Sequence, residues 1–157
     1  TRYWRDWSSD VCSSDLEVYQ ALKDKGYHLI MSGPKNQAAD LPVQYLCLDR
    51  HAFIRLLHSC HVVLCMSRMT EGWNRIAHEA MLCRVPVIGN GSGGMLELLQ
   101  GGRQAIVTDP SLLPEAVTYA LAHRDELAES GYAFASRFDM NYFRQQWCEA
   151  VESLIAR

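Results

Sequence analysis

Short apolar runs that alternate with amphipathic segments constrain the fold of this chain more than any other feature. The apolar runs lie at 27–32, 42–48, 61–66, 86–89 and 105–108. Between and after them, apolar residues recur at helical spacing, at about 49–57, 74–83, 95–99 and from 109 onward. Strands that alternate with helices predict βαβ units, and therefore an α/β fold with a Rossmann-like parallel sheet and helices on both faces.

Single residues predict where several of these elements begin and end. Gly26 is expected to end a first helix, and Asp49 to cap a helix that continues through Leu57. Two further amphipathic helices are predicted at 124–138 and 141–156. The aromatic residues of the last helix are expected to pack in the core, and they are Tyr142, Phe143 and Trp147.

Composition excludes several classes of protein. The 157 residues suffice for one domain with a real core, and no apolar run is long enough to span a bilayer. Fifteen basic and eighteen acidic residues give a net charge of −3, which argues against nucleic acid as a partner. Four of the six cysteines lie in apolar segments without a Cys-x-x-Cys pair, so we expect buried thiols in a reducing compartment. They are Cys47, Cys60, Cys65 and Cys83.

The first sixteen residues differ in character from the rest. The stretch RDWSSDVCSSDL at 5–16 has neither strand nor helix periodicity and repeats Ser-Ser-Asp. We interpret 1–16 as a non-native, adapter-derived or disordered segment and expect the first strand of the domain to be missing. This interpretation divides the chain into 1–16, a ligand-binding domain at 17–138 and a C-terminal helix at 139–157.

The densest concentration of chemically useful residues follows the third apolar run. The stretch SRMTEGWNRIAHEAM at 67–81 carries two carboxylates, Glu71 and Glu79, separated by seven residues. In a parallel sheet, ligands bind beyond the carboxyl ends of the strands, where such a loop lies. Gly72 allows close approach of the backbone, and the helix N-terminus that follows favours anions such as phosphates.

This stretch resembles the donor-binding half of retaining GT-B glycosyltransferases of the family 4, or group 1, type. The similarity continues through RVPVI at 84–88, GGMLELL at 93–99 and Asp109-Pro110, and it covers roughly 17–157. Glu-x7-Glu alone is a weak signal, but the ordered series of segments is specific. The resemblance implies the C-terminal half of a GT-B fold, and we expect the chain to be inactive by itself.

The resemblance also implies roles for individual residues. Glu71 would be catalytic, contacting the transferred sugar, and Glu79 would accept hydrogen bonds from the ribose hydroxyls. The backbone at 72–74 would hold sugar hydroxyls or diphosphate oxygens, and the backbone near Leu48 would border the base. The full set of implied donor-binding residues is Ser67, Gly72, Trp73, Asn74, Arg75, Glu79, Leu48, Gly93 and Gly94. His78 is expected to be a surface or packing residue rather than a catalyst.

The implied reaction is transfer of a hexose from a nucleotide sugar with retention, without a metal or other cofactor in the donor site. The acceptor, whether glycan, lipid or small molecule, stays open, and an N-terminal acceptor domain is expected as the partner of this half. In the family, the last helix packs toward that domain, which is an alternative place for its aromatic residues. The expected location is cytoplasmic, with peripheral attachment to the inner membrane face left open. Two alternatives remain, namely a non-catalytic nucleotide-binding module and a GT-B epimerase or phosphorylase.

Overall fold

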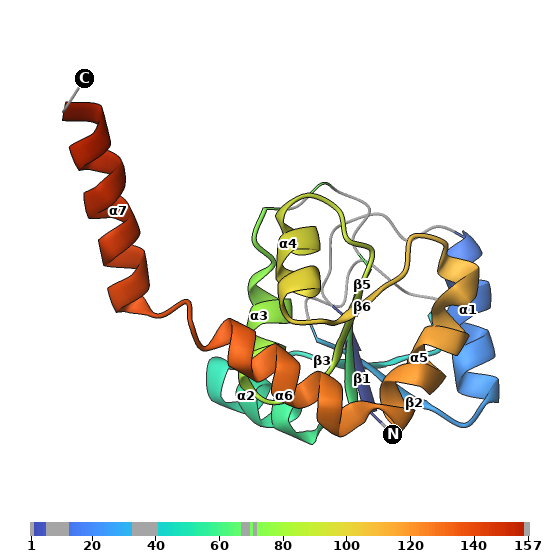
Figure 1. The fold of residues 1–157 in the computed structure, drawn as a ribbon. Coiled ribbons are helices and arrows are strands. Elements are labelled where there is room, and N and C mark those ends of the chain that lie inside the picture. Colours follow the sequence, from blue (N-terminus) through green and yellow to red (C-terminus); the bar gives the residue numbers. More distant parts are fainter. Residues whose placement is uncertain (1, 6–12, 33–40, 67–69, 71, 156–157) are drawn as a thin grey trace.

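The computed structural model describes residues 2–5, 13–32, 41–66, 70 and 72–155. Figure 1 shows a parallel sheet between two layers of helices, with the last helix projecting away from them. The strands are β1 (Arg2–Arg5), β2 (His28–Ser32), β3 (Gln44–Leu46), β4 (Val62–Cys65), β5 (Val87–Gly89) and β6 (Ala105–Ile106). Their order is β3-β2-β1-β4-β5-β6, and every adjacent pair is parallel. This arrangement confirms the predicted α/β fold.

The predicted helices are all present. They are α1 (Ser13–Asp24), α2 (Arg50–Ser59), α3 (Arg75–Leu82), α4 (Gly94–Gly101), the 3₁₀ helix η2 (Pro110–Leu112), α5 (Leu113–Ala122), α6 (Arg124–Ala135) and α7 (Met140–Ile155). Gly26 follows α1 with a φ of 81°, a left-handed conformation that glycine adopts without steric cost. Asp49 caps α2, because its side chain accepts a hydrogen bond from the Ala52 N–H at 2.8 Å. Both predicted boundaries are confirmed.

The expectation that the first strand is missing is wrong. Residues Arg2–Arg5 form β1, in which Tyr3 pairs with Leu29 of β2 on one side and with Val62 of β4 on the other. Helix α1 also begins inside the segment that the sequence excluded. A four-residue strand shows no usable periodicity, and its place between β2 and β4 depends on pairing with residues far away in the chain. The adapter-derived origin of the segment stays a prediction.

Two apolar cores lie on the two faces of the sheet. Helices α1 and α5 cover one face, and α2, α3 and α4 cover the other, with α6 packed on α3 and α4 (Figure 1). The residues of β4 are all buried and alternate between the cores, with Val62 and Leu64 in one and Val63 and Cys65 in the other. The apolar run of β4 therefore reflects burial on both faces, as predicted for a central strand.

A buried amide ties the α3 side of the sheet to α6. Gln104 is 7% exposed, and its Oε1 accepts from the Val87 N–H of β5 at 2.8 Å. Its Nε2 donates to the Gly102 and Leu127 carbonyls, the latter in α6. Gly131 of α6 leaves room for this amide, because a Cβ there would lie 3.1 Å from the Gln104 Nε2. The amide thus joins a strand, a loop and a helix.

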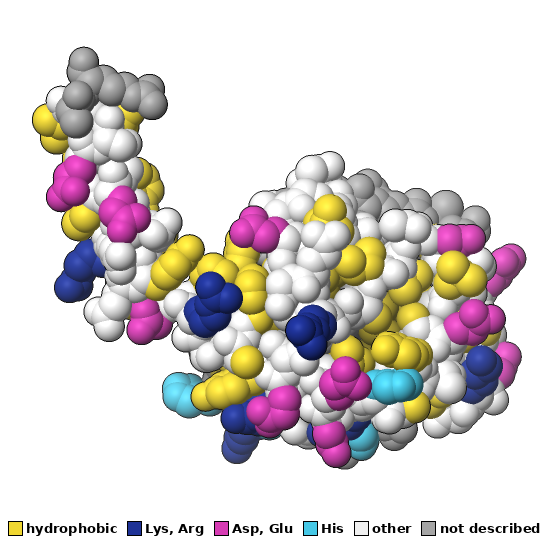
Figure 2. Space-filling model, in the orientation of Figure 1, with side chains coloured by type: hydrophobic (Ala, Val, Ile, Leu, Met, Phe, Trp, Pro, Cys, Tyr) yellow, Lys and Arg dark blue, Asp and Glu magenta, His cyan; other side chains and the backbone are white. Residues whose placement is uncertain are grey.

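Helix α7 has no buried residue, so the prediction that its aromatic residues lie in the core is wrong. Phe143 and Trp147 are more than half exposed, and Figure 2 shows apolar side chains along this helix. Periodicity correctly indicated an amphipathic helix, but it does not identify what covers the apolar side. The alternative expectation, contact with a further domain, is compatible with this exposure.

The cysteines follow the prediction only in part. Cys60 and Cys65 are buried, Cys83 is half-buried and Cys47 is exposed, so the expectation of burial is wrong for Cys47. The cysteines that the structure describes are free thiols. Among the described residues, no group of three or more His, Cys, Asp or Glu side chains is placed to hold a metal ion. Within the same ranges, no helix is both long and apolar enough to cross a membrane.

Candidate functional site

The strand order places the candidate site where β1 and β4 lie side by side. From β1 the sheet runs through β2 to β3 in one direction, and from β4 through β5 to β6 in the other. In doubly wound sheets ligands bind at such a switch point, beyond the carboxyl ends of the strands. Helix α3 follows β4 and starts at this edge. Ser67 and Glu71, both predicted site residues, come between β4 and α3 in the sequence and lie outside the described residues.

A buried asparagine fixes the start of α3. Asn74 is 3% exposed, and its Oδ1 accepts from the Ala77 N–H at 2.8 Å. An N-cap of this kind satisfies one of the four amides that a helix N-terminus leaves without an intrahelical partner. The remaining amides make this end of α3 suited to anions. Asn74 therefore fixes where α3 begins at this edge of the sheet.

The carboxylate of Glu79 lies between two arginines. Its Oε2 accepts from Arg50 Nη1 at 2.8 Å, and its Oε1 lies 3.6 Å from Arg75 Nε. The Glu79 side chain is 12% exposed, whereas those of Arg50 and Arg75 are 60% and 84% exposed. Arg50 begins α2, so the ion pair joins the start of α2 to the second turn of α3, and both helices follow the carboxyl ends of strands.

The Glu79 carboxylate contributes to a raised pKa in two nearby groups. The hydrogen bond and the charge of Glu79 raise the pKa of Arg50 above its ordinary value. Burial, followed by the negative charge of Glu79, raises the pKa of the Cys83 thiol. Cys83 is the C-cap of α3. The raised pKa favours the protonated form of this thiol.

Two glycine loops meet beside the start of α3. A Cβ added to Gly94 would lie 2.8 Å from the Gly72 carbonyl carbon and 2.9 Å from its oxygen. Gly93, the N-cap of α4, has a φ of 63°, which favours glycine. The sequence predicted that these glycines face the donor. In the structure, Gly94 lets the start of α4 approach the Gly72 backbone closely. Gly94 therefore contacts the backbone at the start of α3.

Trp73 and His78 form a second connection at this edge. The Trp73 indole N–H donates to His78 Nδ1 at 2.9 Å, and the rings meet edge to face with centroids 5.7 Å apart. His78 Nε2 lies 2.9 Å from the Ala135 carbonyl oxygen of α6. The expectation that His78 is a packing residue is confirmed by these contacts. Trp73 is 38% exposed.

The structure thus brings together part of the predicted set. Glu79 lies against Arg75, and the Gly72–Trp73 backbone lies against Gly94. Leu48 is half-buried and packs on the core beneath α2 and α3. Sequence reasoning missed Arg50. A cation at the first position of a helix that follows a strand was the available signal, but its contact with Glu79 depends on how α2 and α3 pack.

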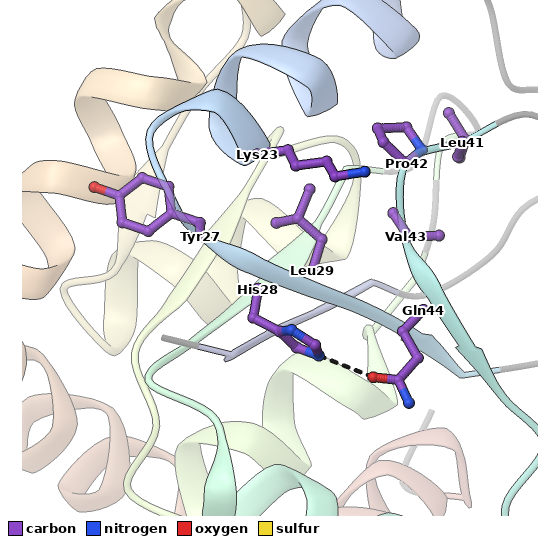
Figure 3. A pocket seen from close by; sticks show the side chains of 8 residues that line it. All are labelled: Lys23, Tyr27, His28, Leu29, Leu41, Pro42, Val43 and Gln44. Atoms are coloured by element: carbon purple, nitrogen blue, oxygen red, sulfur yellow. Dashed lines mark hydrogen bonds between the residues drawn. The ribbon is translucent and has the colours of Figure 1, made fainter.

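A separate hollow of about 420 Å³ lies at the opposite, amino-terminal edge of the sheet (Figure 3). It is lined by the end of α1 and the starts of β2 and β3, including Lys23, Tyr27, Leu29 and Val43. The His28 Nε2 and the Gln44 Oε1 lie 2.9 Å apart across its rim. Because it lies at the amino ends of the strands, this hollow is distinct from the candidate site.

Comparison with known structures shows the same fold in several glycosyltransferases. The Anabaena protein HepE, solved with UDP and glucose, has a TM-score of 0.76 and 20% identity, over 97% of this chain and 48% of its own. Sucrose-phosphate synthase from Thermosynechococcus elongatus gives 0.71 and 17%, over 99% and 45%. Trehalose-phosphate synthase from Burkholderia vietnamiensis gives 0.74 and 15%, over 98% and 45%. The chain therefore spans about half the length of these proteins.

Sequence comparison gives the family. No curated protein sequence matches the chain significantly. The profile of the family described as glycosyl transferases group 1 matches residues 16–123, which is well over half of the chain and includes Glu71, Arg50 and Glu79. On this match, the chain belongs to the group 1 glycosyltransferases.

Proposed function

We propose that this chain is the donor-binding half of a retaining hexosyltransferase that uses a nucleotide sugar. The observation that carries the proposal is the largely buried Glu79 carboxylate beside the switch point of a group 1 glycosyltransferase fold. Burying a carboxylate is costly unless it is paired, and here Arg50 and Arg75 provide the pairing. A carboxylate has about four lone-pair directions, so Glu79 retains acceptor capacity for two ribose hydroxyls.

In the proposed reaction, the bond between the hexose anomeric carbon and the diphosphate breaks, and a bond to an acceptor hydroxyl forms. The nucleoside diphosphate leaves, and the acceptor gives up a proton. Glu71 contacts the transferred sugar, and the amides at 72–74 meet the charge that develops on the leaving diphosphate. Ser67, Gly93 and Leu48 complete the donor contacts as the resemblance implies.

The cationic partners of the diphosphate are proposed to be arginines of this half. The residues after β1, DWSSDVC at 6–12, contain no lysine or arginine. Arg75 is the most exposed cation beside Glu79, with an 84% exposed side chain. We propose that it turns toward the diphosphate while Arg50 stays on Glu79. That no metal takes part is also a proposal, and adding a chelator should then leave transfer unchanged.

The first test is nucleotide binding by the chain itself. Titration with UDP, GDP and ADP should show binding of one nucleotide, and Glu79→Gln should weaken it by about tenfold or more, since hydrogen bonds to charged groups are strong. Glu115→Gln, an exposed carboxylate on α5 at the other face of the sheet, is the matched control. Equal affinity in wild type and Glu79→Gln would contradict the ribose role.

Sugar transfer requires the acceptor half, which we propose as the partner of the apolar side of α7. In a longer protein that contains both halves, Glu71→Ala should abolish transfer while nucleotide binding persists. Normal transfer by Glu71→Ala would rule out the catalytic role. Nucleotide binding without transfer by the unaltered protein would favour a non-catalytic module. A cytoplasmic location is retained as part of the proposal.

A further inference from the structure

Two sets of contacts hold the start of α3. One is made between backbone atoms, and the other between side chains. On one side Gly94 lies against the Gly72 carbonyl group. On the other, the Trp73 side chain lies against His78 and Phe138, with ring centroids 5.7 and 4.7 Å away. Between them, these contacts leave the Gly72–Trp73 backbone little freedom.

The hydrogen bonds determine the state of His78. An indole N–H can only donate, so the His78 Nδ1 that receives it carries no proton. A backbone carbonyl can only accept, so the His78 Nε2 must donate its proton to the Ala135 oxygen. This pair of hydrogen bonds fits the tautomer that carries its proton on Nε2. Each ring nitrogen has a hydrogen-bond partner, which is Trp73 for Nδ1 and the Ala135 carbonyl of α6 for Nε2.

Position along α3 separates His78 from its neighbours. Ala77, Ala80 and Met81 are buried in the core, and Glu79 points toward Arg50 of α2. His78 points instead toward α6 and Phe138. Leucine would fill this position equally well if packing were its only role. The pair of hydrogen bonds is the feature that leucine could not reproduce.

We propose that His78 is a positioning residue for the donor site, which fixes Trp73, and with it the Gly72–Trp73 backbone, to the end of α6. This inference rests on the proposed function for its consequence, since the amides beside Trp73 are those assigned to the donor. The clamp itself does not depend on that assignment, because it connects residues within the chain.

The clamp also reaches the first turn of α7. Phe138 stacks edge to face on Tyr142 with centroids 5.1 Å apart, and it contacts Phe134 of α6 at 5.0 Å. The aromatic contacts therefore run without interruption from Trp73 to Tyr142 of α7, a helix in which every residue is exposed.

The test compares four single variants of the whole chain, together with the double variant that combines His78→Leu and Trp73→Phe. His78→Leu keeps apolar packing and removes both hydrogen bonds, whereas His78→Gln keeps an acceptor and a donor. Trp73→Phe removes the same hydrogen bond from the other side. His58→Leu, an exposed histidine in the last turn of α2, is the control. Melting temperatures identify any variant that fails to fold.

The first readout is the indole N–H signal in a proton–nitrogen NMR spectrum, identified by its loss in Trp73→Phe. It should be protected from hydrogen exchange in the wild type, His78→Gln and His58→Leu, and unprotected in His78→Leu. Unchanged protection in His78→Leu would overturn the clamp. This result does not require any nucleotide to bind.

The second readout is the Kd of the nucleotide that binds best among UDP, GDP and ADP. His78→Leu and Trp73→Phe should each weaken it about three- to tenfold, as expected for one hydrogen bond, and the double variant no further than either. His78→Gln should restore most of the affinity. Equal affinity in all variants would overturn the positioning role. If the wild type bound none of them, the proposed function would fail, whereas the NMR result would still decide the clamp.

Discussion

Helices α3 and α7 look alike as sequence patterns and differ completely in their surroundings. Both carry apolar residues at helical spacing, and each follows a polar residue whose side chain accepts a hydrogen bond from a backbone N–H of the first turn. Helix α3 buries Ala77, Ala80 and Met81, whereas α7 buries nothing. Amphipathicity therefore shows that a helix has a face to cover, and the cover itself must come from elsewhere. For α3 it is the sheet and α6, and for α7 the proposed cover is another domain.

The largest expected difference is in the free energy of unfolding, between two methionine variants with one on each helix. Met81 is fully buried on α3, and Met140 of α7 is 71% exposed. Met81→Ala should lower the free energy of unfolding by about 2–5 kcal/mol, the usual loss when a buried methionine leaves a cavity. Met140→Ala should change it by less than about 0.5 kcal/mol. Chemical denaturation measures both, and equal losses would contradict the contrast between the two helices.

The next comparison concerns glutamines. Gln104→Leu leaves the Val87 N–H and the Leu127 carbonyl without their amide partner, which should cost about 1–3 kcal/mol. Gln146→Leu on α7 removes only a bond to Glu149 on the surface. Thermal unfolding should therefore distinguish them. A Gln104→Leu variant with the melting temperature of the wild type would show that the hydrogen bonds of Gln104 do not stabilise the packing of α6 on the sheet.

Helix caps provide a smaller difference. Asn74→Ala should cost about 1 kcal/mol, which corresponds to a shift of about 2–4 °C in melting temperature for a chain of this size. Asp139→Ala removes the bond to the Tyr142 N–H at 2.8 Å, but it should leave the melting temperature unchanged because α7 lacks buried residues. The loss of this cap should be visible only as a decrease in the helical signal of the far-ultraviolet circular dichroism spectrum. A matched loss of melting temperature would show that α7 unfolds together with the rest.

The smallest perturbation is chemical modification of cysteines. Cys83 is half-buried with a raised pKa, and Cys148 of α7 is exposed. Because the thiolate is the reactive species, a raised pKa keeps Cys83 unreactive until a higher pH than usual. At pH 8, iodoacetamide should label Cys148 before Cys83, and the labelling rate of Cys83 should continue to rise with pH. Mass spectrometry of digested protein follows each site separately, and faster labelling of Cys83 would contradict its burial.

Much of the candidate site could be anticipated, because its residues cluster in one segment after one strand. Glu79 and Gly72 were indicated by the loop and helix that follow β4, and Gly94 by the next glycine-rich loop. The Arg50–Glu79 pair and the Trp73–His78–Ala135 connection could not be anticipated. Each joins elements separated in sequence, so its formation depends on packing angles that no local pattern contains.

The sequence by itself determined most elements of this protein after residue 16, since periodicity, caps and turn glycines act over a few residues. It indicated the buried strand β4, the cap at Asp49 and the left-handed Gly26. The tertiary structure alone decided that Arg2–Arg5 completes the sheet between β2 and β4 and that α7 stands apart. It also decided which arginine meets Glu79. These outcomes depend on contacts between distant segments, where the free energy of pairing and burial is shared by residues that the sequence does not place together.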